Sequence, residues 1–342
     1  MNLEYDDEEA GLLRQAGEIL EKIAPIPASG RAARPADWPA LAGAGWSGLG
    51  AAVQAQELPL AVAVGLARQA GRQLLAEELV STGWELSALA SSAEEDARAQ
   101  LHDQLTERPA ILLGDGRRQA VPVVTGDVTV GCCFGAAPGC AVYRLLSQEG
   151  GLILQRWVGA PPALAPLAGL SPSVAAVTID PAAGQWRGYP LSWAEADLGP
   201  LRTQVMLAHS AALTGCAERL LEITCQHVRS RVQFGVPIGS FQAVKHGLAD
   251  VHTALVVAWN AVLSAAADGA EPLLAPLVAR VLTVQAALGA ARAGAQFHGG
   301  MGFTAELNVH LFLKAILDGV QRGGAPDDVA VELGRRFVAA AC

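Results

Sequence analysis

The feature that most constrains the fold is a long helical pattern that fills the chain from Leu198 to its end. Apolar residues recur there at the three- and four-residue spacing of buried helix faces, with few breakers. The pattern predicts helices over 198–229, 241–267, 273–295, 305–318 and 326–340. Because consecutive long helices with short connections pack against one another, we expect a C-terminal helical bundle.

The middle of the chain has a different pattern. Between about Trp84 and Trp193, short Val, Ile and Leu runs are separated by Gly, Pro and Asp, which is typical of β-strands joined by tight turns. Helical spacing precedes this region, over 6–22 and 57–81, and one more helix is expected over 93–105. The sequence therefore predicts an α+β protein with an N-terminal helical domain (1–83), a reduced middle β domain (84–196) and a C-terminal helical bundle (197–342).

Charge and cysteine content limit the kinds of partner. The 24 Lys and Arg against 33 Asp and Glu give a net charge of −9, which argues against a broad surface for nucleic-acid phosphates. The six cysteines form no CxxC pair, and no His-Cys cluster has zinc-site spacing, so no metal is expected. The acidic N-terminus lacks the regions of a signal peptide, and polar residues interrupt each apolar stretch before about 18 residues accumulate. We expect a cytoplasmic protein without a membrane span.

Two segments carry candidate chemistry. The first runs from Arg231 to Ile238, as Arg-Val-Gln-Phe-Gly-Val-Pro-Ile, and continues with Phe241, Gln242 and Lys245. A fixed guanidinium can bind a phosphate, and a phenyl face can cover a purine ring. Taken alone, an ordinary turn between two helices with an exposed arginine explains this segment equally well.

The second segment is Gln296 to Glu306, which contains three glycines within four positions, from Gly299 to Gly302. Glycines permit close approach of the backbone to a ligand, and the N-terminus of a following helix offers free N–H groups to anionic oxygens. Taken alone, a glycine-rich helix end is the simpler explanation.

Other charged and titratable residues on the predicted helices have simpler interpretations. No histidine pair has metal-ligand spacing, so the following are expected as surface or core residues: His209, His227, His246 and His252. Glu218 and Glu222 are expected to lie together on a solvated face.

Together and in this order, the two segments closely resemble the C-terminal domain of acyl-CoA dehydrogenases, in which an Arg-x-x-Phe-Gly loop and a Gln-x-x-Gly-Gly loop hold FAD. The resemblance covers about Leu198 to Asp318, and the helical, β, helical order agrees with that family's fold. It implies that Arg231 binds the FAD pyrophosphate and that the ribose and adenine lie against Gln233 and Phe234. The remaining residues implied to line the site or to supply backbone contacts are Phe241, Gln242, Gln296, Phe297, His298, Gly299 and Gly300.

The resemblance also implies a carboxylate base, and the chain departs from the family there. The usual position of the base lies 23 residues after Gly300, where this chain has Gly323. The alternative position lies 26 residues before Arg231, where this chain has Val205. Removal of an α-proton without a positioned base is slow, so no catalytic residue is expected in this chain. The Thr-Glu-Pro, Gly-Ser-Asp and Trp-x-Thr segments that contact the flavin ring in the family are also missing, which predicts a degenerate isoalloxazine pocket.

With these departures, the chain resembles the shorter subunit of bacterial α2β2 acyl-CoA dehydrogenases. In those enzymes the homologous partner of the shorter subunit supplies the base and the flavin ring pocket. The resemblance implies FAD as cofactor, an acyl-CoA such as a steroid side-chain CoA ester as substrate, and an electron-transfer flavoprotein as acceptor. Two alternatives remain open. One is a self-sufficient homo-oligomer with an unrecognised base, and the other is a flavin-free structural or regulatory homologue.

Overall fold

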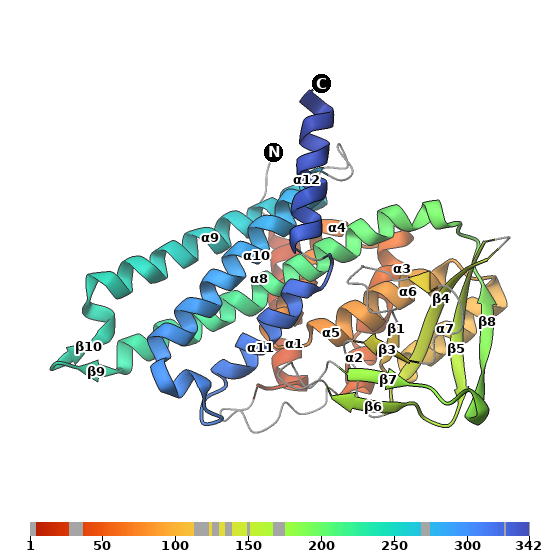
Figure 1. Ribbon diagram of the computed structural model, residues 1–342, viewed down its shortest axis with the longest axis horizontal. Coiled ribbons are helices and arrows are strands. Elements are labelled where there is room, and N and C mark those ends of the chain that lie inside the picture. The colour runs from red at the N-terminus through yellow and green to blue at the C-terminus, as the bar shows by residue number, and fades with distance from the viewer. Residues whose placement is uncertain are drawn as a thin grey trace. The chain divides into compact units, whose positions relative to one another are not determined.

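The computed structural model describes residues 5–26, 37–112, 123–124, 130–133, 139–148, 151–166, 175–267, 274–324 and 326–341 (Figure 1). The chain divides into two compact units. The helical unit comprises Met1–Arg34, Val64–Ala76 and Met206–Cys342; the sheet unit comprises Pro35–Ala63 and Glu77–Val205. The α+β class is confirmed, with helices before and after a central region of strands. The three domain ranges expected from the sequence stay a prediction.

The helical unit is a bundle built from long helices close to their predicted bounds. Its elements are α1 (Asp7–Ile23), most of α4 (Leu60–Arg72), α8 (Leu198–Ser230) from Met206 onward, α9 (Gln242–Ala267), α10 (Leu274–His298), η6 (Gly299–Phe303), α11 (Val309–Gln321) and α12 (Pro326–Ala341).

Two of the predicted helices differ from the observed ones. The helix expected over 57–81 is interrupted after α4, where Leu74 has a φ of +60°, before α5 (Ala76–Val80) begins. A positive φ in a leucine breaks a right-handed helix. The helix expected over 305–318 begins only at Val309, because residues 304–308 form turns between the short 3₁₀ helix η6 and α11.

The core of the helical unit lies where α8, α9, α10 and α11 meet. Phe312 and Ile316 of α11 are fully buried there against Leu220 of α8 and Ala287 of α10. Each large apolar side chain buried in this way contributes about 1.5–3 kcal/mol. The bundle therefore has an apolar core of its own that packs α8, α10 and α11 together.

Two glycines let α4 and α8 cross with their backbones in contact. A Cβ built on Gly71 would meet the carbonyl of Ala212, and one on Gly215 would meet the carbonyl of Arg68. No larger residue fits at either position without moving a backbone. The crossing therefore depends on these two glycines.

Ion pairs flank the same crossing. Arg68 of α4 lies 2.6 Å from Glu218 of α8, and Arg72 lies 2.8 Å from Glu222. The Glu218 side chain is only 16% exposed. The expectation of a solvated face is therefore wrong for Glu218, whereas the Glu222 side chain is 43% exposed, and each glutamate is paired with an arginine of the neighbouring helix.

The sheet unit holds the strands predicted for the middle of the chain, together with several short helices. Its helical elements are α2 (Trp38–Gly43), η1 (Trp46–Gly48), α3 (Leu49–Gln54), most of α5, the π-helical η2 (Ser81–Leu86), α6 (Ser87–Ser91), α7 (Glu95–Glu107), η3 (Pro181–Ala183) and η4 (Glu195–Asp197). Its strands are β1 (Ala110–Leu112), β2 (Val123–Val124), β3 (Val130–Cys133), β4 (Ala141–Gln148), β5 (Gly151–Gly159), β6 (Ala163–Pro166), β7 (Ala175–Thr178) and β8 (Gly184–Pro190).

The strands form two sheets with an apolar core. One sheet has the order β1-β4-β5-β8 with β2 also paired to β4, and the other has the order β3-β7-β6. Val142 and Trp157 of the first sheet are buried in one cluster with Val177 of the second. The Trp157 and Trp186 rings meet edge to face with centroids 5.5 Å apart, which suits the quadrupoles of aromatic rings.

Two helices of the helical unit, α9 and α10, are long and apolar enough to cross a membrane by length and composition. Each helix has its own most apolar stretch, and 44% of that stretch is buried in α9 and 50% in α10. Core helices of soluble proteins pass the same test, so the expectation of no membrane span stays a prediction.

Candidate functional site

The segment around Arg231 forms a tight hairpin at the junction of α8 and α9 (Figure 1). Its strands are β9 (Val232–Gln233) and β10 (Val236–Pro237), and the turn residues Phe234 and Gly235 both have positive φ, +53° and +81°. Two consecutive positive φ values are the requirement of a type I′ turn. The hairpin closes with the N–H of Ile238 donating to the carbonyl of Arg231 at 2.9 Å. We call residues 231–238 the arginine loop.

The side chains of the arginine loop face outward. Arg231 and Gln233 are exposed, and the phenyl ring of Phe234 is 92% exposed. The ring of Phe241, at the end of the loop, lies edge-on to Phe234 with centroids 6.3 Å apart, and Gln242 is also exposed. The loop thus presents a guanidinium beside two accessible aromatic faces.

The segment from Gln296 to Gly300 covers the C-terminal end of α10 and the start of η6. Gly299 has a φ of +58°, and a Cβ built on Gly299 or Gly300 would meet nothing within 4 Å. Gln296 is exposed, whereas the ring of Phe297 packs against Gly247 of α9, 3.3 Å from where a Cβ would stand. We call residues 296–300 the glycine loop, and its backbone has open space for a ligand.

The structure brings the two loops together through a histidine pair. His227, in the last turn of α8, stacks on His298 with ring centroids 4.3 Å apart and an interplanar angle of 27°. The carbonyl of His227 accepts a hydrogen bond from the N–H of Arg231 at 2.8 Å. This contact of His227 was not predictable from local spacing, because its partner His298 is distant along the chain.

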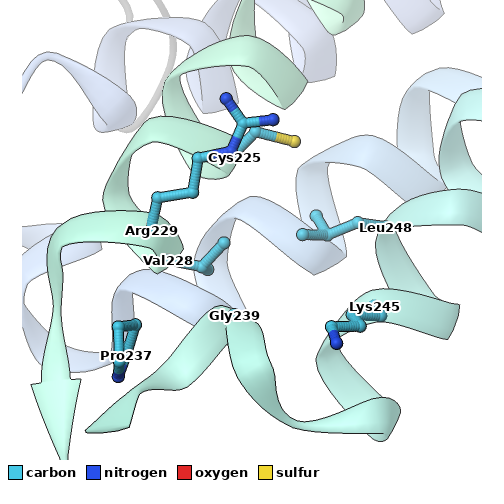
Figure 2. Close-up of a pocket in the computed structure, with 7 residues that line it drawn as sticks. All are labelled: Cys225, Val228, Arg229, Pro237, Gly239, Lys245 and Leu248. Atoms are coloured by element: carbon cyan, nitrogen blue, oxygen red, sulfur yellow. The ribbon is translucent and has the colours of Figure 1, made fainter.

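A cavity of about 370 Å³ opens beside the arginine loop (Figure 2). Two cations line it, Arg229 from the end of α8 and Lys245 from the first turn of α9. Its remaining lining residues are Cys225, Val228, Pro237, Gly239 and Leu248. The structure thus brings Arg229 and Lys245 to one cavity, and Arg231 is not among the residues that line it.

Comparison with known proteins agrees with this arrangement. Residues 203–319 match the family described as acyl-CoA dehydrogenase, C-terminal domain. The chain carries the C-terminal domain of the acyl-CoA dehydrogenase family. The matched residues include both the arginine loop and the glycine loop.

Named relatives match parts of the chain. Acyl-CoA dehydrogenase IpdE2 of Mycobacterium tuberculosis is 40% identical over 120 residues, which make up 35% of this chain and 37% of that protein. Acyl-CoA dehydrogenase FadE34 of the same organism is 34% identical over 223 residues, covering 61% of this chain and 29% of that protein. The matched segment thus spans well under half the length of either relative.

Solved structures share the fold over almost the whole chain. A chain of the ChsE4-ChsE5 complex from Mycobacterium tuberculosis has a TM-score of 0.78 at 21% identity, over 99% of both chains. A variant of the Tcur3481-Tcur3483 steroid ACAD has a TM-score of 0.76 at 22% identity, over 98% of this chain and 99% of that chain. The acyl-CoA dehydrogenase fold expected from the sequence is therefore confirmed.

Neither family position for the base holds a carboxylate. Gly323 is buried, has a φ of +69°, and would place a Cβ 3.3 Å from both the Cα of Met206 and the Cβ of His209. Val205, at the alternative position, is fully buried. At Gly323 the local backbone itself excludes a larger residue, because positive φ and close neighbours both oppose a side chain.

A buried arginine, Arg280 of α10, holds the turn that contains Gly323. Its guanidinium donates to the carbonyls of Gly319 and Val320 at 2.9 Å each, and to that of Arg322. Burial lowers the pKa of Arg280 to about 9, which leaves it charged at neutral pH. Burial and the charge of Arg280 also lower the pKa of His209 to about 3, so that His209 is uncharged at neutral pH.

The site can therefore bind an anionic, partly aromatic ligand, but neither family position can accept a proton. Within the described part of the chain, no group of three or more His, Cys, Asp or Glu side chains lies close enough to hold a metal ion. The expected degenerate flavin ring pocket falls largely on residues 113–122, 125–129, 134–138 and 149–150, which lie outside the described residues.

Proposed function

We propose that this chain is the base-lacking subunit of a heteromeric acyl-CoA dehydrogenase. It binds the adenosine-pyrophosphate end of FAD, and a homologous partner subunit supplies the base that removes the α-proton of an acyl-CoA. The observation that carries the proposal is the combination of two adjacent, open cofactor loops with a glycine at the base position.

The residues of both loops fit FAD. Arg231 is an exposed guanidinium able to form bidentate bonds to a phosphate, and the exposed ring of Phe234 can lie against the adenine. Gly299 and Gly300 leave open space through which a ligand can approach the backbone. In the complex, Gln233 and Gln242 provide amide donors and acceptors, and Phe241 extends the aromatic face.

Bound FAD supplies the chemistry of hydride acceptance from the β-carbon of the thioester. The part played by this chain is to bind and orient the distal half of the cofactor, since positioning alone lowers a barrier by several kcal/mol. It moves no proton at the reacting carbon, because Gly323 and Val205 have no acidic group.

Two of the comparisons support a partner. Structures similar to this chain include chains of the ChsE4-ChsE5 complex and of the Tcur3481-Tcur3483 steroid ACAD. The segment matched to FadE34 makes up 61% of this chain but only 29% of FadE34, so FadE34 is about twice as long. A protein of that length has room for two copies of this fold in one chain. It would then be equivalent to one α subunit and one β subunit of a heteromer.

The same reasoning extends to substrate and acceptor. We infer that the assembled α2β2 enzyme desaturates an acyl-CoA, with steroid side-chain CoA esters as the favoured class, in line with the steroid ACAD among its structural neighbours. It passes its electrons to an electron-transfer flavoprotein and operates in the cytoplasm.

Flavin content tests the proposal. The chain is purified alone and together with a longer homologue from the same source, and FAD is measured in each sample after denaturation. We expect about one FAD per heterodimer in the complex and none in the isolated chain. Arg231→Ala should release the FAD, whereas Arg14→Ala, at an equally exposed arginine on α1, should not.

Other outcomes select the alternatives. Stoichiometric FAD in the isolated chain, together with acyl-CoA oxidation, would establish a self-sufficient homo-oligomer. A complex that forms without FAD would establish a flavin-free structural or regulatory role.

A further inference from the structure

Both loops lie next to a stacked histidine pair, since His227 precedes the arginine loop and His298 lies within the glycine loop. His227 lies in the last turn of α8, four residues before Arg231, and His298 is the last residue of α10, directly before Gly299. Their ring centroids are 4.3 Å apart at an interplanar angle of 27°. The pair therefore joins the two helix ends from which the loops start.

Hydrogen bonds fix both histidines at their helix ends: the main chain of His227 holds Arg231, and the ring of His298 is held by Gly294 of α10. The carbonyl of His227 accepts from the N–H of Arg231 at 2.8 Å, so a shift of the last turn of α8 moves the start of the arginine loop. His298 Nδ1 lies 2.9 Å from the carbonyl of Gly294 and donates to it. A Cβ on Gly302 would stand 3.1 Å from the Cβ of His298, so the glycine-rich turn is folded closely around this side chain.

The two rings stack as neutral groups at neutral pH. Burial lowers the pKa of both histidines, and that of His227 is lowered further by the neighbouring His298 and Arg231. Neutral imidazoles stack without charge repulsion, and aromatic contacts of this kind hold their partners beyond simple burial of area.

We propose that His227 is a positioning residue of the flavin site, which holds the arginine loop in register with the glycine loop through its stack on His298. This inference rests on the proposed function, because the register matters only if both loops bind one cofactor. The required property is an aromatic ring at position 227, since the imidazole nitrogens of His227 have no role in it.

The test compares His227→Ala, which removes the ring, with His227→Phe, which keeps a ring. His252→Ala, at an exposed histidine on α9, is the matched control. Deuterium exchange of backbone amides in residues 294–303 is measured on the isolated chain, and the Kd for FAD is measured on the complex with the longer homologue.

We expect His227→Ala to speed exchange in residues 294–303 and to raise the Kd for FAD, each by about three- to tenfold, the size of one aromatic contact. His227→Phe should restore both values, which a general loss of folding would not permit. If His227→Ala behaves like His252→Ala in both measurements, or if His227→Phe fails to rescue, the positioning role is wrong while the proposed function stands. If the wild-type complex binds no FAD, the proposed function itself fails, whatever the exchange shows.

Discussion

Replacing Gly323 by alanine should destabilise the helical unit by about 2–5 kcal/mol. An alanine held at the φ of +69° costs about 1–2 kcal/mol, because its Cβ crowds the following carbonyl. The new methyl group would also stand 3.3 Å from the Cα of Met206, a backbone atom of α8 that cannot move aside like the end of a flexible side chain. Overpacking of this kind adds about 1–3 kcal/mol.

Gly299→Ala is the matched control, because Gly299 also follows a helix, has a φ of +58° and would place its Cβ in open space. Gly299→Ala should lower the free energy of unfolding by only about 1–2 kcal/mol, the cost of holding an alanine at a positive φ. The assay is urea unfolding of the full chain, followed by far-UV circular dichroism, with the shift in midpoint compared between the two variants. Equal losses would refute the crowding argument. A larger loss at Gly323 would predict that Gly323→Glu also destabilises the helical unit, because its Cβ meets the same neighbours.

Two further predictions concern the polar groups buried near that turn. The free energy of unfolding should fall by roughly 4–5 kcal/mol as pH drops from 6.5 to about 3, because His209 binds a proton in the unfolded chain but not in the folded chain, where its pKa is about 3. Urea midpoints should fall less steeply with pH across this range in His209→Leu. An equally steep fall in this variant would contradict the role given to His209. Arg280→Met should cost about 3 kcal/mol at neutral pH, because three carbonyls at the end of α11 lose their donor; a thermal melt with an unchanged midpoint would contradict this capping role.

The sequence predicted those features of the fold that depend on local pattern. The bounds of α8, α9 and α10 follow from apolar spacing and from the Gly and Pro residues between the helices, and the observed ends lie within three residues of the predicted ones. The arginine loop and the glycine loop also follow from local sequence, because glycines with positive φ lie where the adjoining helices end.

Features that depend on contacts between distant segments were not predictable. Glu218 and Glu222 form a like-charge pair along α8, and only the crossing with α4 shows that Arg68 and Arg72 neutralise them. The stack of His227 on His298 likewise joins residues from different helices. No period or spacing within one segment contains that information.

Anaerobic addition of acyl-CoA to flavin-loaded protein tests whether the partner subunit supplies the base, with loss of oxidised-flavin absorbance as the readout. A saturated straight-chain acyl-CoA and a steroid side-chain CoA ester are each added to the isolated chain supplied with FAD and to the complex with the longer homologue. We expect loss of absorbance with at least one ester in the complex, none in the isolated chain, and none in a complex whose partner lacks its base carboxylate. Loss of absorbance in the isolated chain, or in the complex without the partner's base, would contradict this expectation.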